Sequence, residues 1–209
     1  ISADGRYLAF ECGGPGLFPG QDPNAPFRGV LLHDRATGQR RLVTHTFAGS
    51  TVPASFGMYG AMSADGRFIA WSTFATDVLA GLVDTNQRAD VYVFDRTRDA
   101  SSLVSHRVGA PLAAANGESL PQGISDDGRT VAFLSAATDL VAGVANPHDL
   151  DAVERVAREI PRDREPDLAP RRDLARRGAV LTQPAAFDEP VMPDVVCRAV
   201  PPRDLRHLA

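Results

Sequence analysis

Three stretches of alternating apolar residues, each preceded by an Asp-Gly pair, dominate the pattern of hydrophobic and polar positions along the chain. They occupy residues 1–10, 62–71 and 124–133, and read ISADGRYLAF, MSADGRFIAW and ISDDGRTVAF. The serine near the start of each copy recurs after 61 residues, from 2 to 63, and then after 62, from 63 to 125. A fixed period of this length indicates a supersecondary unit repeated along the chain.

The repeated stretch predicts a tight turn that leads into a β-strand. We expect the Asp-Gly pair to take the positive-φ positions of the turn. In the strand of the middle copy, Ile69 and Trp71 lie on one face. Phe68 and Ala70 lie on the other. Because both faces are apolar, the strand is expected in a sheet packed between two neighbours, with Ile69 and Trp71 buried against one and Phe68 against the other.

Further segments recur with the same period and predict the remaining strands of each unit. They lie at residues 30–35 and 91–96, at 42–45 and 103–106, and, before the two later turns, at 54–62 and 117–124. Four strands therefore fit into one period, and residues 54–108 should form one four-stranded antiparallel sheet without helix. Residues 11–28 are rich in Gly and Pro, which predicts a long surface loop.

A four-stranded antiparallel unit that repeats at fixed spacing, with both faces apolar, is typical of a β-propeller blade. The Ser-x-Asp-Gly-Arg stretches are followed by residues 75–77 (ATD) or 137–141 (ATDLV), and in the middle copy by residues 90–93 (DVYV). These motifs resemble the WD-repeat-like blades of TolB-like bacterial propellers over residues 1–146. The resemblance implies an all-β, partial β-propeller. About two and a half copies are too few to close a ring of four to eight blades, so a fragment is expected.

The repeat pattern stops near residue 147, and the composition changes with it. Residues 151–160 have apolar residues at helical spacing, an Asp151–Glu154 pair that resembles a capping box, and Pro161 at their end, which together predict a helix. Residues 147–209 hold 9 of the 16 Pro and a single Gly. We therefore expect an irregular or partly helical tail of low order, and hypothesise that a frameshift near residue 147 replaced the missing strands.

Composition and charge exclude some classes of protein. The chain of 209 residues has no run of eighteen apolar residues, so membrane insertion is not expected. Its formal net charge of −4 gives no electrostatic argument for binding nucleic acid. Cys12 and Cys197, the two cysteines, lie in compositionally different parts of the chain and are interpreted as unpaired.

The sequence contains no convincing catalytic or cofactor-binding constellation. Serine and aspartate of the Ser-x-Asp-Gly stretches recur once in every unit, which favours turn-forming side chains over a nucleophile and its base. His45 and His106 also occupy equivalent positions in the repeat, which favours structural roles over metal binding. No Gly-x-Ser-x-Gly motif of a serine hydrolase is present.

One connection offers ligand-like chemistry. Asp84, Asn86 and Asp90 supply oxygen-bearing side chains at positions 1, 3 and 7 of a loop, as at the start of a calcium-binding loop. The loop lacks the glycine at position 6 and the acidic residue at position 12, so stabilisation of a turn is the competing interpretation. A weak Ca²⁺ site confined to the middle unit is the metal prediction that the sequence allows, and no other cofactor is predicted.

The resemblance implies that the protein functions by binding a partner and not by catalysing a reaction. A TolB-like propeller would be a non-enzymatic scaffold that presents loops to a protein or cell-envelope partner, in the periplasm or outside the cell. The alternative is the propeller domain of a larger enzyme, either the gating domain of a peptidase or part of a glycan hydrolase or lyase. The sequence leaves the partner and the oligomeric state open.

Overall fold

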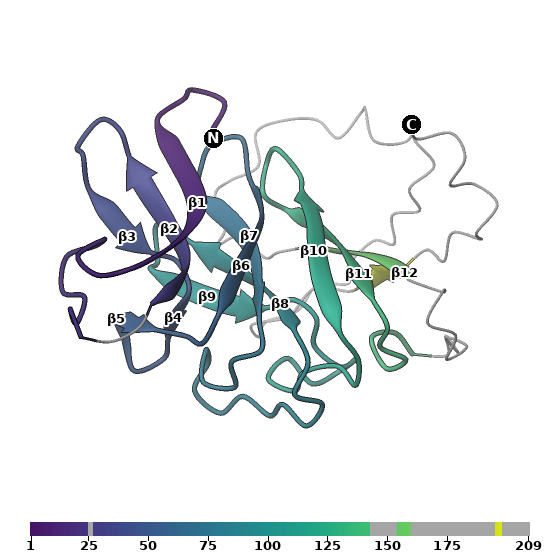
Figure 1. Cartoon of the computed structure of the whole chain (residues 1–209). Coiled ribbons are helices and arrows are strands. Elements are labelled where there is room, and N and C mark those ends of the chain that lie inside the picture. The colour runs from purple at the N-terminus through teal and green to yellow at the C-terminus, as the bar shows by residue number, and fades with distance from the viewer. Residues whose placement is uncertain (25–26, 143–153, 160–194, 198–209) are drawn as a thin grey trace.

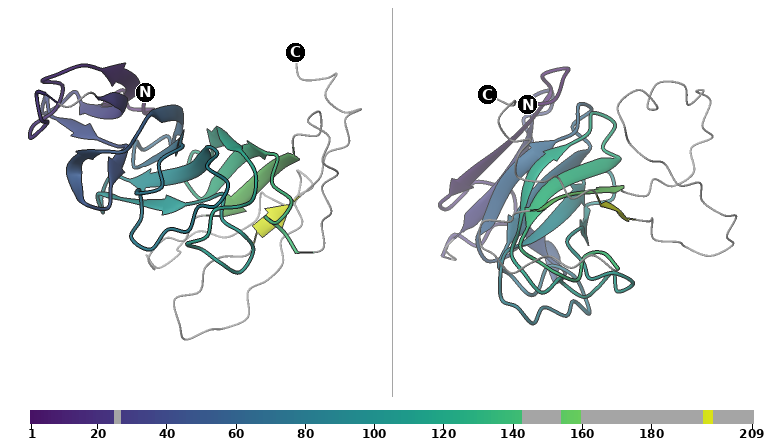
Figure 2. Two further views of the ribbon diagram at one scale, coloured as in Figure 1. Left: turned by 60° about the horizontal axis from the view of Figure 1, so that its bottom comes forward. Right: turned by 90° about the vertical axis from the view of Figure 1, so that its right-hand side faces the viewer.

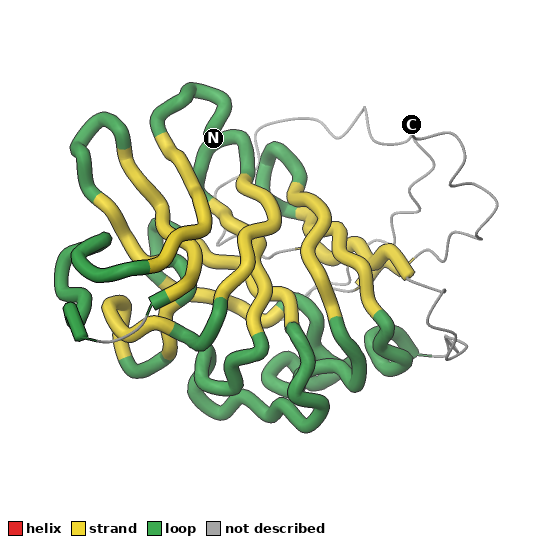
Figure 3. The backbone as a smooth tube through the Cα atoms, in the orientation of Figure 1, coloured by secondary structure: helices red, strands yellow, loops and turns green. Residues whose placement is uncertain are grey.

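The computed structural model describes residues 1–24 and 27–142, together with the strands at residues 154–159 and 195–197 (Figure 1). These residues form strands joined by turns and loops, and no helix occurs among them (Figure 3). The strands pair antiparallel in several small sheets. The prediction of an all-β, antiparallel fold is confirmed.

The middle repeat forms one four-stranded sheet, as predicted for residues 54–108. Its strands follow each other in chain order as β6 (Gly57–Met62), β7 (Phe68–Thr73), β8 (Asp90–Asp95) and β9 (Ala100–Leu103). The fourth strand ends earlier than the predicted 103–106. Val104 and Ser105 both donate their N–H groups to the Val91 carbonyl, at 2.8 and 3.3 Å, which breaks the regular ladder at this point.

Two further sheets flank the middle one. The third repeats its order of four strands, and the first repeats the last three of them. The first consists of β1 (Tyr7–Gly13), β2 (Arg28–Asp34) and β3 (Arg40–Leu42), and the third of β10 (Ser119–Ile124), β11 (Thr130–Ser135), β12 (Glu154–Glu159) and β13 (Val195–Cys197). The three sheets lie side by side (Figure 2). A short hairpin of β4 (His45–Thr46) and β5 (Gly49–Pro53), which the sequence did not predict, lies between the first sheet and β6.

The predicted helix over residues 151–160 is wrong for residues 154–159, which form β12. This strand pairs with β11, with Glu154 opposite Ser135 and Glu159 opposite Thr130. The exposed backbone groups of β11 offer a ladder of hydrogen bonds, which outweighs the weak helix preference of one short segment. Residues 151–153 and 160, and the low order predicted for most of residues 161–209, lie outside the described residues.

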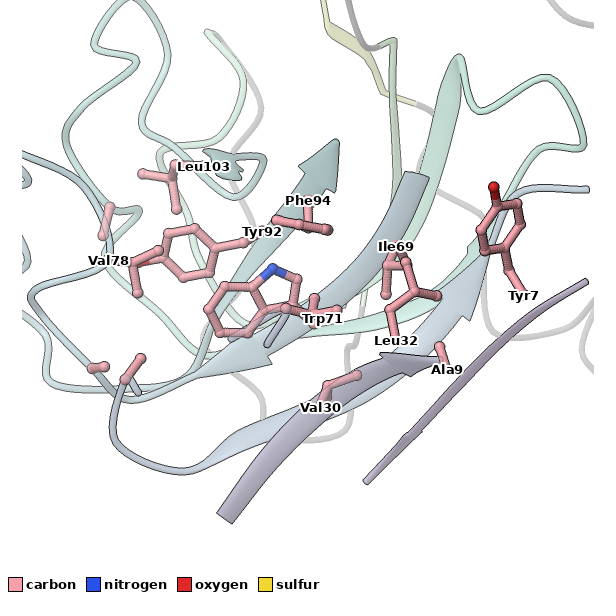
Figure 4. Close-up of a cluster of buried hydrophobic side chains, with 14 residues drawn as sticks. Tyr7, Ala9, Val30, Leu32, Ile69, Trp71, Val78, Tyr92, Phe94 and Leu103 are labelled. Atoms are coloured by element: carbon pink, nitrogen blue, oxygen red, sulfur yellow. The ribbon is translucent and has the colours of Figure 1, made fainter. Parts of the chain in front are cut away.

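The core consists of side chains packed between neighbouring sheets. Ile69 and Trp71 share one cluster with residues of the first sheet, among them Tyr7 and Val30 (Figure 4). On the opposite face of β7, Phe68 and Ala70 share a second cluster with Val131 and Phe133 of the third sheet. All six residues of β7 are buried. The prediction of a strand packed on both faces is confirmed.

The Asp-Gly turns differ from the prediction in one respect. Among the Asp-Gly pairs only the glycine has a positive φ, of +70° at Gly5 and +66° at Gly66 and Gly128. In the first copy the glycine N–H donates to the Ser2 carbonyl at 2.9 Å, and Ser63 and Ser125 accept equivalent bonds. The aspartate keeps a negative φ, and its carboxylate accepts the N–H of the arginine two residues later, as at Asp4 and Arg6 (3.0 Å).

The two interfaces between sheets use the same backbone hydrogen bonds. At the end of the array that carries the Asp-Gly turns, the turn end, Ala3 N–H donates to the Ala64 carbonyl (2.8 Å), and Ala64 N–H donates to the Asp126 carbonyl (3.1 Å). At the opposite, loop end, equivalent bonds run from Phe47 to Asp77 (3.0 Å) and from Val108 to Asp139 (2.9 Å). One kind of interface is therefore formed twice along the chain.

Candidate functional site

The long connections between strands gather at the loop end of the array. Residues 74–89 join β7 to β8, and residues 104–118 join β9 to β10. The two connections are tied together, since Val83 N–H donates to the Leu112 carbonyl (2.8 Å) and Ala114 N–H donates to the Val83 carbonyl (2.9 Å). All three residues of the predicted calcium site lie at this end of the middle sheet.

Asp84 and Asn86 stabilise the connection that contains them. The Asp84 carboxylate accepts hydrogen bonds from the N–H groups of Asn86 (3.0 Å) and Gln87 (3.1 Å), and Gln87 has a φ of +53°. The Asn86 side chain donates to the Ala115 carbonyl and accepts from the Arg88 N–H. These bonds agree with the turn-stabilising interpretation of both side chains.

Asp90 is almost completely buried at the first position of β8, with 1% of its surface exposed. Burial raises the pKa of this carboxyl group to about 7. A hydrogen bond from the Ser105 hydroxyl (2.8 Å) opposes that rise, whereas the charges of Asp84 and Asp139 add to it. Asp90 therefore lies among other acidic groups, and its protonated form is stabilised near neutral pH.

The buried Asp90 carboxyl should make stability depend on pH. Because its pKa rises from 3.8 to about 7 on folding, the native state binds the extra proton, and stability falls as pH rises from about 4 to 7. We expect Asp90→Asn to remove this part of the dependence while keeping an acceptor for Ser105. Urea unfolding across that pH range is the measurement. Parallel curves for the two proteins would contradict the assignment.

Calcium binding stays a prediction. Among the described residues no group of three or more His, Cys, Asp or Glu side chains has a metal-binding arrangement. A calcium-dependent rise in melting temperature that Asp84→Asn lacks would support the site, because asparagine keeps an acceptor oxygen at position 84 and loses the charge. An equal rise in both proteins would exclude it.

The Ser–Asp pairs at the turn end form local hydrogen bonds, as predicted. The Ser63 hydroxyl donates to the Asp65 carboxylate at 2.6 Å and accepts the N–H of Phe68 at 3.0 Å. Equivalent bonds occur in the other two copies. The arginine that follows each turn adds a bidentate pair in two copies, from Arg6 to Asp34 and from Arg67 to Asp95.

The surroundings of His45, His106 and Cys12 also favour structural roles for these side chains. His45 and His106 lie in equivalent places, and the Nδ1 atom of each is within 3.0 Å of the carbonyl oxygen of the next residue. Cys12 is a half-buried free thiol, and burial raises its pKa, which disfavours the reactive thiolate. The side chain of Cys197 lies outside the described residues.

A group of exposed aliphatic side chains at the loop end was not predicted. Val83, Val108 and Leu112 are 52%, 44% and 45% exposed and come from the two connections that the Val83–Leu112 bond joins. We call these three residues the apolar loop patch. Val83 and Leu112 lie beside other apolar residues, Leu82 and Ala113, and neither connection has the alternation of a strand that would show which side chains are exposed.

Comparison with protein-family models, with curated proteins and with solved structures found no match. Among the residues that the structure describes, no helix is long and apolar enough to cross a membrane. Inference about function therefore depends on the geometry of the chain itself.

Proposed function

We propose that this chain is part of a TolB-like β-propeller and acts as a non-enzymatic scaffold whose loop end binds a protein partner. Successive sheets that share an order of three strands, and an interface repeated between them, support the propeller. Exposed connections held on a rigid framework support binding, because loops on such a framework are common recognition surfaces. The envelope location implied by the resemblance is part of this proposal.

The apolar loop patch is the observation that carries the proposal. Its three side chains are exposed although the sheet beneath them is packed on both faces. The connections are also fixed: Asn116 N–H donates to the Asp139 carboxylate (2.9 Å), and the Asn116 side chain exchanges two 2.8 Å hydrogen bonds with Thr138. A preorganised apolar surface binds with a smaller loss of conformational entropy than a mobile loop.

The proposal is tested by placing a photoreactive amino acid at position 112 or, as a control, at Thr97, which is exposed at the turn end. We expect position 112 to give a discrete cross-linked product with a protein from the source cells, and Val83→Asp to remove this product. The same products from both positions, or a product that persists in Val83→Asp, would argue against a specific loop surface.

The competing proposal, a propeller domain of a larger enzyme, makes a different prediction. For this chain we expect no turnover of peptide or glycan substrates, because the Ser–Asp pairs are occupied by turn hydrogen bonds and recur in each unit. A reproducible activity that disappears on a single side-chain change would contradict the scaffold proposal.

A further inference from the structure

The face of the first sheet that points away from the middle sheet is apolar and partly exposed. Leu8, at 36% exposure, lies on this face, and Phe10 and Cys12 follow it at alternate positions of β1. Behind them lies a small cluster that includes the buried side chains of Leu31 and Leu42. This set, the head face, is equivalent in the repeat to the face of the middle sheet that contains Ile69 and Trp71.

Part of the head face is covered by the connection that the sequence indicated as a surface loop. Phe18 and Phe27 are 7% and 6% exposed, and their rings meet edge to face at 5.4 Å between centroids. They belong to the same cluster as Leu31. The connection of the middle sheet behaves in the same way, since its Val78 packs in the first interface. The loop therefore covers Leu31 and Leu42 and leaves Leu8 as the most exposed side chain of the head face.

The third sheet has the complementary face, which none of the described sheets covers. Thr130, Ala132 and Leu134 of β11 are half-buried and point away from the middle sheet, whereas Val131 and Phe133 pack against it. We call Thr130, Ala132 and Leu134 the tail face. The equivalent residues of β7 are fully buried, because the third sheet covers them.

The turn glycines distinguish covered faces from open ones. A Cβ atom added to Gly66 would lie 2.6 Å from the Tyr7 ring of the preceding sheet, and one added to Gly128 would collide with the Phe68 ring. At Gly5, the first turn, the nearest atom is on the long Arg35 side chain, 3.6 Å away. The Gly5 turn thus has the same backbone conformation, but among the described residues no aromatic ring packs against it.

We propose that the tail face of one copy of this chain packs on the head face of a second copy, and so repeats the interface already formed twice within each chain. A second copy is the expected partner because its end face is of the same kind as the faces that pack at both internal interfaces. At both interfaces within the chain, a face equivalent to the tail face packs on a face equivalent to the head face. At both, a backbone N–H of one Asp-Gly turn also donates to a carbonyl of the next. The equivalent groups at the two ends of the array are the Asp126 N–H in the third sheet and the Ala3 carbonyl in the first.

The proposed contact joins two different surfaces, so it is heterologous. Such contacts either close into a ring or continue as an open chain of copies. Two copies would bring together six sheets of this repeat, a number within the four to eight blades of closed propellers. The closure into a ring, but not the contact itself, rests on the proposed propeller.

Two variants test the contact, one for each face. Leu8→Asp alters only the head face and Leu134→Asp only the tail face, so each variant retains the other face intact. By sedimentation equilibrium, we expect the wild-type chain to have at least twice its monomer mass of 22.3 kDa and each variant alone to be monomeric. An equimolar mixture of the variants should form a one-to-one dimer and nothing larger.

Several outcomes would overturn the proposal. They are a monomeric wild-type chain at every concentration, association that survives in either variant, and a mixture that stays monomeric. Leu112→Asp in the apolar loop patch is the control. It should leave association unchanged, and a loss there would assign self-association to the loops instead. Circular dichroism and Trp71 fluorescence establish that each variant is folded, and Leu8→Gln and Leu134→Gln replace any aspartate variant that is not.

Discussion

Replacing Trp71 with alanine is expected to lower the free energy of unfolding by about 3–5 kcal/mol, the range found for deleting large buried aromatic side chains. Trp71 is fully buried in the first interface, and its ring stacks on Tyr92 at 5.1 Å between centroids. Its Nε1 atom is buried with no hydrogen-bond partner among the described residues, so losing this polar atom offsets a small part of the cost.

Urea unfolding followed by far-ultraviolet circular dichroism measures this effect, since the variant lacks the only tryptophan of the chain. Trp71→Phe should lose much less stability because it keeps an aromatic ring in the cluster. Val83→Ala, in the exposed apolar loop patch, is the matched control and should change stability little. A Trp71→Ala variant as stable as this control would contradict the position of Trp71 at the interface.

Much of the fold could be predicted because the middle strand has apolar residues on both faces. Only a sheet between two neighbours buries both Phe68 and Ile69, and the fixed period supplies those neighbours from the same chain. The sequence pattern therefore predicted which sheets lie next to each other, which the pattern of a single helix or strand usually does not. The Ser–Asp pairs were interpretable for the same reason, because a side chain that recurs in every unit is more easily explained by the turn than by chemistry.

The sequence-based predictions were wrong where the local sequence pattern and the tertiary contacts favour different structures. Residues 154–159 have helical spacing of apolar residues, yet pairing with β11 makes them a strand, and this pairing is not visible in the segment itself. Phe18 and Phe27 lie in a segment dominated by Gly and Pro, and only the folded chain brings them onto Leu31. Local periodicity does not report such contacts, since they form between parts of the chain with no shared pattern.

The candidate site could be predicted only in part, for a related reason. The spacing of Asp84, Asn86 and Asp90 predicted a calcium site, and the structure places all three residues at the loop end. Ala115 and Ser105, which bond to Asn86 and Asp90, come from a later connection. The burial that raises the pKa of Asp90 is likewise a property of the folded sheet. Spacing along the chain shows which groups are available, but not which are already bonded.

Gly66→Ala is expected to cost about 2–5 kcal/mol, through two effects that can be separated. A residue with a side chain at a φ of +66° costs about 1–2 kcal/mol, and forcing a methyl group into a filled contact typically adds about 1–3 kcal/mol. The contact is filled because the added Cβ would lie 2.6 Å from Tyr7 Cδ2 and 2.9 Å from Tyr7 Cβ, which cannot move without the backbone.

Gly5→Ala provides the matched control, because Gly5 has the same turn and a φ of +70° but no ring above it. It should therefore cost only the conformational part, about 1–2 kcal/mol. In a double-mutant cycle, Tyr7→Ala should remove the part of the excess cost of Gly66→Ala that comes from the ring, since alanine keeps Cβ, and should leave the cost of Gly5→Ala unchanged. Equal costs for the two glycine variants would mean that the first and middle sheets do not meet at this turn, and the proposed association of copies, which repeats that interface, would lose its basis.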